Sequence, residues 1–467
     1  MQVTSPIVGW IWLLVFFLVM FSMAYFTLEK SKTKENFLVA DRSLGLRRSS
    51  FSIAATWIWA PALFIAAQLA YQKGWVGLFW FLVPNILCLV IFSEFAYRFR
   101  EKLPEGFTLS EYMLKRFSER VQNLYMVELL GLAICSFAVQ LLAGGLIFST
   151  LTGIPFMQVT IAMSAIALSY SIMSGISASV LTDHIQYIII ALAAFIFVPW
   201  VVINAGGFDA IRAGWNGVSG QYTSLFSGSG ASVFFSFGLA TTIGLLAGPF
   251  GDQTFWQRAQ STKKEYVRRA FVFGAIAFGV IPLFLSGLGF VMAGTTIKVG
   301  SAQLVNLQAV LHYLPQWTAV PFVFMLLCGL VSTLDSALCA ISSIAGGDIA
   351  DRVGSKNPML FARVSMIVAV IGALIIANVP GMQILYLFLF YGTLRASVLI
   401  PTVMTLLSEK IAEAGVFWGI LLSIGIGLPI FAYGNFNKIS SIIVLGSLIT
   451  VCTSGLVTYV VSRRMKA

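Results

Sequence analysis

Apolar stretches of 18 or more residues, the length that a spanning helix needs, recur along the whole chain between short polar connections. Alternating ten-residue strand patterns are absent from the sequence, so a transmembrane barrel is not expected. We therefore predict an all-α integral membrane protein with about 13 transmembrane helices. The predicted helices cover residues 7–27, 51–72, 75–97, 123–151, 154–174, 183–204, 232–250, 267–293, 318–346, 360–378, 382–407, 416–435 and 439–461.

Two of the predicted helical segments are interrupted in their interior. The first, within 51–72, contains Pro61, which removes a backbone hydrogen bond and kinks or breaks a helix. The second, within 234–259, contains Gly244 and then the run Gly248-Pro249-Phe250-Gly251. Interrupted helices at corresponding positions of two halves indicate a transporter built from inverted repeats.

The positions of the two interrupted helices also suggest how the chain is divided. Five predicted helices separate their starts, so the two run in opposite directions, as an inverted repeat requires. We expect an extra N-terminal helix and loop, a first five-helix repeat, an outer loop, a second five-helix repeat and two C-terminal helices, at residues 1–50, 51–204, 205–231, 232–407 and 408–467.

Composition and charge agree with a membrane protein. Hydrophobic residues make up 58% of the chain and charged residues 10%, whereas soluble domains carry about 25% charged residues. With the N-terminus outside and the C-terminus in the cytoplasm, 24 of the 29 Lys and Arg residues fall in inner loops. The net charge of +11 therefore reflects membrane topology, and no nucleic-acid partner is expected. The sequence has no nucleophile elbow, phosphate loop or metal-ligand cluster, so an enzyme is not expected either.

Polar side chains occupy the middle of the apolar run 321–345. Asp335 lies there, and a carboxylate inside a spanning helix is by default a candidate functional residue. Helical periodicity places Ser332, Ser336, Cys339 and Ser343 on one face, with Thr333 and Asp335 on its flanks. Hydroxyl and carboxylate oxygens suit a hard cation.

Several short motifs carry a resemblance to a known family. They are FLVADRSLG (37–45), SGISASVLTDHIQ (174–186) and VSTLDS (331–336). On these motifs the chain resembles the sodium:solute symporter family, which has an inverted five-plus-five helix core, over nearly its whole length. ATWIWAPAL (55–63) and DQTFWQRA (252–259) are most similar to the urea and polyamine branch of that family.

The resemblance implies two groups of cation-binding residues. For the main sodium ion it implies the Ser332 and Thr333 hydroxyls and backbone carbonyls of Gly329, Ala54 and Trp57. For a second cation, or for a path of sodium release, it implies Asp183, Asp335 and Ser336 together with Ser332. Asp335 stands where the family usually has a hydroxyl, so a proton in place of a second sodium is an open alternative.

Other interpretations of these residues remain open. Hydroxyls in spanning helices commonly bond to the carbonyl four residues earlier, and Ser332 and Thr333 could do only that. Asp335 could couple to an ion or form a structural ion pair with Arg395, while Arg395 could instead bind a substrate carboxylate. The substrate-binding candidates on or near the two breaks are Trp59, Gln68, Phe250, Gln253 and Arg395.

These observations predict a sodium-coupled secondary active symporter that imports a small polar organic solute by alternating access. The expected partners are the solute, sodium ions and the lipid bilayer. The alternative is an uncoupled or proton-coupled facilitator or channel for a small solute such as urea. The sequence does not identify the solute, because a fold says little about what its site accepts.

Overall fold

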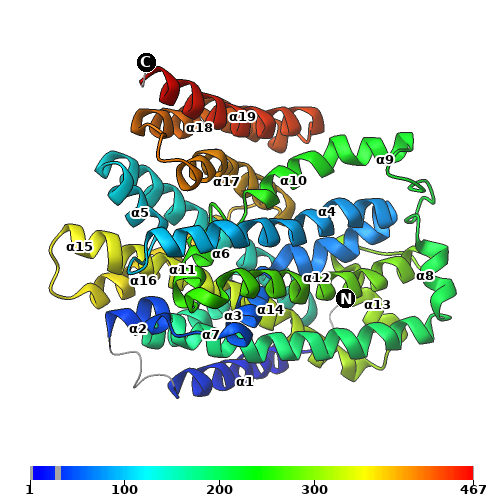
Figure 1. Ribbon diagram of the computed structural model, residues 1–467. Coiled ribbons are helices and arrows are strands. Elements are labelled where there is room, and N and C mark those ends of the chain that lie inside the picture. Colours follow the sequence, from blue (N-terminus) through cyan, green and yellow to red (C-terminus); the bar gives the residue numbers. More distant parts are fainter. Residues whose placement is uncertain (1–3, 27–32, 466–467) are drawn as a thin grey trace.

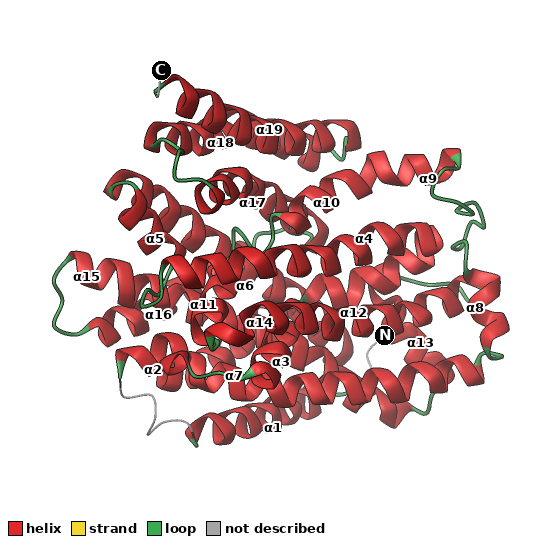
Figure 2. Ribbon diagram, in the orientation of Figure 1, coloured by secondary structure: helices red, strands yellow, loops and turns green. Residues whose placement is uncertain are grey.

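The computed structural model describes residues 4–26 and 33–465, and this part of the chain is a bundle of helices (Figures 1 and 2). The described residues contain no β-strand, only an isolated bridge between Leu44 and Thr262, which confirms the all-α prediction. The helices are α1 (Pro6–Tyr25), α2 (Lys34–Val39), α3 (Leu46–Trp57), α4 (Ala60–Lys102), α5 (Leu109–Arg116), α6 (Glu119–Thr152), α7 (Phe156–Asn204), α8 (Phe208–Gly214), α9 (Gly228–Val233), α10 (Leu239–Leu246), α11 (Gln253–Ser261), α12 (Val267–Ala293), α13 (Val305–Tyr313), α14 (Ala319–Ile344), α15 (Ala350–Arg352), α16 (Pro358–Ala377), α17 (Ile384–Leu407), α18 (Glu413–Phe436) and α19 (Ser440–Arg464).

Eleven helices in the described part of the chain are long and apolar enough to cross a membrane. Two of them, Pro61–Lys102 with 42 residues and Phe156–Asn204 with 49, are much longer than the roughly 20 residues of one crossing. Each contains a glycine with positive φ, Gly74 at 57° and Gly175 at 55°. At each glycine the backbone leaves the helical conformation, so each long element consists of two helices joined across a kink. The count of eleven treats each kinked pair as one element, and the expected number of 13 is not confirmed.

Both predicted helix interruptions are present. Helix α3 ends at Trp57 and α4 begins at Ala60, with Pro61 in the first turn of α4, where proline is tolerated because that turn needs no internal N–H donor. In the second half, α10 ends at Leu246 and α11 begins at Gln253. The two breaks leave backbone groups without helical partners inside the bundle.

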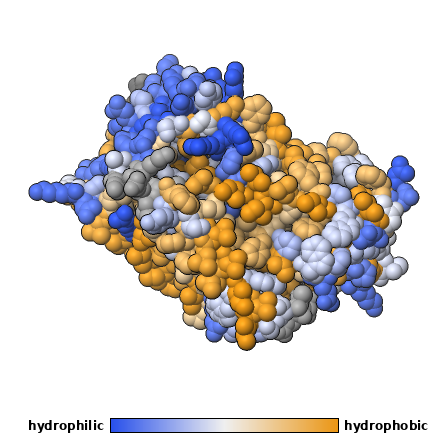
Figure 3. Space-filling model, turned by 90° about the horizontal axis from the view of Figure 1, so that it is seen from below, coloured by the Kyte–Doolittle hydropathy of each residue, from blue (hydrophilic) through white to orange (hydrophobic). Residues whose placement is uncertain are grey.

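Helix α14 forms the centre of the bundle. The most apolar stretch of its span is 94% buried, whereas those of α1 and α16 are 28% buried. Figure 1 shows α18 and α19 at one edge and α1 at the opposite edge, with α14 between them. Figure 3 shows apolar side chains across the middle of one face and hydrophilic ones toward two ends, as a surface that spans a bilayer requires.

Gly175 permits α2 to lie against α7. A Cβ atom at Gly175 would lie 2.3 Å from the carbonyl oxygen of Phe37, and its φ of 55° is strained for any other residue. Gly354 has a similar φ of 60°, but a Cβ there would meet no atom within 4 Å. The two glycines thus share a positive φ, and only Gly175 adds a close contact with a neighbouring backbone.

We expect Gly175→Ala to lower the thermal unfolding midpoint more than Gly354→Ala. Both variants place a side chain at a positive φ that non-glycine residues rarely adopt, which costs of order 1–3 kcal/mol. Only the first adds overlap with a neighbouring backbone, which costs a further 1–3 kcal/mol, roughly. Thermal unfolding of the purified variants in detergent measures the difference. Equal shifts would show that the contact with Phe37 contributes nothing.

Candidate functional site

The first helix break meets the middle of α14. Thr333 Oγ1 lies 3.1 Å from the Thr56 carbonyl oxygen and 3.2 Å from that of Gly329. Gly329 permits this approach, because a Cβ there would lie 2.9 Å from the Ile58 carbonyl oxygen. The crossing thus gathers a hydroxyl and two carbonyls around one point, all suitable ligands for a hard cation.

The residues predicted for the main sodium ion are only partly brought together. Gly329 and Thr333 meet at the break, and the carbonyl beside them is that of Thr56, which the sequence analysis did not include. The Ala54 carbonyl accepts the Ile58 N–H at 2.9 Å within the last turn of α3. The Trp57 indole N–H points to the Asn85 carbonyl at 3.3 Å.

A buried carboxylate, Asp183 on α7, connects this crossing to two further helices. It accepts hydrogen bonds from Ser332 at 2.5 Å and from Ser52 at 2.6 Å. It also forms an ion pair with the Arg258 guanidinium on α11, at 3.0 Å. Arg258 in turn donates to Ser336 at 2.6 Å, so one cation ties α7, α11 and α14 together.

Asp335 is completely buried and has a shell of hydroxyl groups. Three of them lie on α7 and one on α14: Tyr170 at 2.6 Å, Ser179 at 2.7 Å, and Thr182 and Ser336 at 3.3 Å each. The ion pair between Asp335 and Arg395 that the sequence left open is not formed. Asp335 faces α7, whereas Arg395 on α17 faces the second helix break.

Arg395 pairs instead with Asp252, which caps the start of α11. The guanidinium Nη2 lies 2.6 Å from Asp252 Oδ2, and the Tyr391 hydroxyl donates to the same oxygen at 3.1 Å. The Arg395 guanidinium carbon lies 3.5 Å from the Tyr391 ring centroid, a cation–π contact. Both charged side chains are buried, so each neutralises the other in a medium of low dielectric constant.

A closed cavity of about 10 Å³ lies between the two breaks, with room for roughly one water molecule. Two buried donors of its lining have no hydrogen-bond partner in the described residues, Trp59 Nε1 and Arg395 Nε. A molecule larger than water therefore fits only if the lining residues move apart. Such a molecule would then lie beside the unpaired N–H groups of Trp59 and Arg395. The lining residues are Thr56, Trp57, Trp59, Ser136, Asp252, Thr254, Phe255, Thr333, Tyr391 and Arg395.

Among the predicted substrate-binding residues, Trp59 and Arg395 line this cavity and the other three do not. Gln68 donates to Gln72 within α4 at 3.3 Å. Phe250 packs against Phe92 with ring centroids 5.1 Å apart. Gln253 is held by backbone groups of Phe107 and Leu109 and by Ser343.

Polar contacts join α5 to the end of α14. The Asp348 carboxylate, just after α14, accepts hydrogen bonds from Thr108 at 2.7 Å, Ser110 at 2.9 Å and Gln122 at 2.9 Å. Burial raises the pKa of Tyr112 on α5 to about 12, so its hydroxyl remains a donor. Together with the hydrogen bonds of Gln253, these contacts join the start of α11 and the end of α14 to α5.

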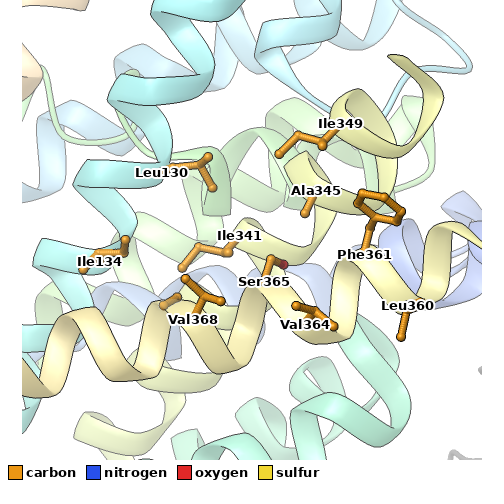
Figure 4. A pocket seen from close by; sticks show the side chains of 11 residues that line it. Leu130, Ile134, Ile341, Ala345, Ile349, Leu360, Phe361, Val364, Ser365 and Val368 are labelled. Atoms are coloured by element: carbon orange, nitrogen blue, oxygen red, sulfur yellow. The ribbon is translucent and has the colours of Figure 1, made fainter. Parts of the chain in front are cut away.

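A larger pocket of about 430 Å³ lies away from the polar centre (Figure 4). Its lining is almost wholly apolar and comes from α6, α16, α14 and the turn after α14, and in Figure 4 the side chains of Ile134, Ile341 and Val368 point toward one another across it. Because no charged residue lines this pocket, we do not regard it as part of the candidate functional site.

Sequence reasoning missed Arg258, Asp252, Tyr170 and Tyr391. The charge count places Arg258 in an inner loop, but its side chain is buried. A signal was present in DQTFWQRA, where Asp252 and Arg258 both follow a helix break and flank apolar aromatic residues. Their partners lie 75 residues or more away along the chain and cannot be read from local spacing.

A family model described as the sodium:solute symporter family matches residues 37–423. The probable urea active transporter 1 of Schizosaccharomyces pombe is 24% identical over 83% of this chain and 63% of its own length. The urea-proton symporter of Oryza sativa subsp. japonica is 22% identical over 87% of this chain and 62% of its own length. The chain thus spans about three-fifths of these two relatives. The sodium/glucose cotransporter of Vibrio parahaemolyticus is 24% identical over 85% of this chain and 79% of its own length.

Solved structures show the same fold. A Na+-coupled sialic acid symporter aligns with a TM-score of 0.78 at 15% sequence identity, over 98% of both chains. A transporter of the nucleobase-cation-symport-1 family aligns with a TM-score of 0.61 at 15% identity, over 92% of this chain and 96% of its own. At such identities the likeness concerns the fold alone.

Proposed function

The chain belongs to the sodium:solute symporter family, and from this premise we propose that it is a sodium-coupled symporter that imports a small neutral solute by alternating access. The resemblance predicted from the sequence, including the urea branch, is thereby confirmed. The protein is a multi-pass membrane transporter rather than an enzyme. We further propose that the N-terminus lies outside and the C-terminus in the cytoplasm.

The observation that carries the sodium proposal is the crossing of α14 with the first break. A sodium ion bound by Thr333, Gly329 and the Thr56 carbonyl, with Ser332 beside them, would hold the two elements together. Unwound backbone coordinates sodium in transporters of this kind. The membrane potential then contributes about 2.3 kcal/mol per 100 mV for each sodium ion that moves inward, and this energy supports accumulation of the solute.

The closed cavity favours a small uncharged amide as the solute. A charged solute would add an uncompensated charge beside the neutral Asp252–Arg395 pair in a site of low dielectric constant, which costs free energy. The unpaired N–H groups of Trp59 and Arg395 suit an acceptor oxygen, and Asp252 suits N–H donors. Urea has both groups on one small planar molecule, and two relatives are urea transporters by name.

A second candidate is proton-coupled transport of the same solute. The burial of Asp335 favours it, because a buried carboxylate that has no ion-pair partner among the described residues is a natural place for a proton. The Oryza sativa relative is by name a urea-proton symporter. In this alternative Asp335 carries the coupling proton, and Thr333 stabilises only the helix crossing.

We expect uptake of labelled urea into sealed vesicles to require an inward sodium gradient. The same vesicles are tested with a proton gradient alone, and with proline, a polyamine, a sugar and a carboxylate as solutes. Ser332→Ala and Thr333→Ala are each expected to raise the half-maximal sodium concentration about tenfold, since each removes an interaction with a charged group. The decisive measurement is the initial rate of uptake against sodium concentration.

Ser342→Ala is the matched control for these two variants. Ser342 lies on the same helix and is fully buried, and within the described residues its hydroxyl bonds only to the Cys339 carbonyl, at 2.7 Å. Its loss should leave the sodium dependence unchanged. Uptake that ignores sodium but follows the proton gradient would favour the second candidate, and uptake that ignores both would refute coupled transport.

A further inference from the structure

Arg258 occupies the place where the resemblance predicts a second cation. Of the residues implied for that cation, Asp183 and Ser336 both contact its guanidinium Nη2, at 3.0 Å and 2.6 Å. We propose that Arg258 is a built-in cation that fills the second cation site, so that the protein binds one exchangeable sodium ion per transport cycle. The proposal rests on the sodium-coupled function proposed above.

The guanidinium is held as a bound ion would be, by oxygen atoms on several elements. Its Nε donates to Ser52 on α3 at 3.0 Å, and Nη1 lies 3.3 Å from the Thr254 carbonyl on α11. The Arg258 side chain is 1% exposed and its partner Asp183 is 0% exposed. Arginine keeps its charge in proteins and cannot dissociate from the chain, so this cation does not exchange during transport.

The charges around α14 leave one position for a mobile cation. Two carboxylates, Asp183 and Asp335, lie within one hydrogen-bonded network through Ser336, and Arg258 is the one basic residue that contacts either of them in the described part of the chain. With both carboxylates ionised the network carries one uncompensated negative charge. One sodium ion near Ser332 and Thr333 compensates it, and a second would create an excess positive charge in a buried site.

Removing the built-in cation should open the second site. In Arg258→Gln the Asp183 carboxylate keeps its Ser52 and Ser332 neighbours but loses its positive partner. A second sodium ion can then neutralise Asp183 among oxygen ligands. In the double variant Arg258→Gln/Asp183→Asn the charge is balanced again, and the second site disappears. Arg258→Lys keeps a fixed positive charge and serves as the matched control.

The test is the number of radioactive sodium ions bound at saturation per full-length chain in lipid nanodiscs, with no solute present. We expect one ion for the wild type, two for Arg258→Gln, and one for both Arg258→Lys and the double variant. Size-exclusion chromatography checks that each variant is folded. If Arg258→Gln does not fold, the double variant carries the test, because it lacks both charges and should fold and bind one ion.

The outcomes separate this proposal from the proposed function. A wild type that binds no sodium would refute sodium coupling itself. A wild type that binds two ions, a folded Arg258→Gln that still binds one, or a double variant that binds none or two would overturn the role of Arg258 while leaving sodium coupling intact.

Discussion

Replacing Arg395 by Gln is expected to reduce urea uptake about a hundredfold or more, and Asp252→Asn is expected to do the same. Each substitution removes one partner of a buried ion pair and leaves the other charge uncompensated, which costs about 3–5 kcal/mol. The loss also removes the complementary donor and acceptor proposed for the solute. Initial uptake rates, normalised to the amount of folded protein in the membrane, measure the effect.

The double variant Arg395→Gln/Asp252→Asn distinguishes the pair from two independent roles. If the main cost is the uncompensated charge, the double variant should fold better than either single variant, and the two effects should not add. Its uptake should stay low, because the polar contacts to the solute are still missing. Full recovery of uptake would show that the pair is structural and that the solute binds elsewhere.

An exposed ion pair provides the matched control. Glu94 contacts Arg98 at 2.8 Å and Arg268 at 2.7 Å, and all three side chains are about 40–50% exposed. Such pairs contribute about 1 kcal/mol or less. Glu94→Gln should therefore leave both folding and uptake close to wild type. A large effect there would mean that uptake responds to ion pairs in general.

The features that were predictable from the sequence are those encoded locally. Proline and glycine interrupt helices by their own backbone properties, so both breaks were expected and both are present. The polar face of α14 follows from helical periodicity, and Ser332, Thr333 and Asp335 are all buried at the centre. Composition indicated a membrane protein, and the recurring apolar stretches without strand alternation predicted the all-α fold.

The features that were not predictable are pairings between distant segments. Whether Arg395 meets Asp335 or Asp252 depends on how α17 rotates against α11 and α14, and no spacing along the chain fixes that rotation. Ser332 and Thr333 illustrate the same limit. Thr333 makes the local bond to the Gly329 carbonyl, as hydroxyls commonly do, whereas Ser332 bonds to Asp183, 149 residues away.

The Gly74 and Gly175 segments show why helix counts differ. Hydropathy separates the chain into crossings at polar or helix-breaking residues, and the structure has a kink with non-helical backbone angles at each of these two glycines. Each long element therefore consists of two helices joined across a kink, and counting the pair as one helix lowers the number of spans. The number of crossings depends on where α4 and α7 leave the bilayer, which composition does not determine.

Asp335→Asn is expected to raise the sodium concentration for half-maximal uptake about a hundredfold. In the charge balance proposed above, Asp335 is the carboxylate that the mobile cation neutralises, since Asp183 is paired with Arg258. Ser332, beside the proposed ion, is three residues before Asp335, and two unit charges at the 5–6 Å typical of such helix neighbours attract each other by about 3 kcal/mol at an effective dielectric constant near 20. The measurement is the sodium dependence of the initial rate of urea uptake.

Asp348→Asn is the control for this last variant, because Asp348 is also buried and accepts three hydrogen bonds, but it lies beyond the end of α14 beside α5. It should leave the sodium dependence unchanged even if it lowers stability. An Asp335→Asn protein with wild-type sodium dependence would contradict the charge balance. If that variant instead loses a dependence on the proton gradient, Asp335 carries a proton, and the proton-coupled alternative holds.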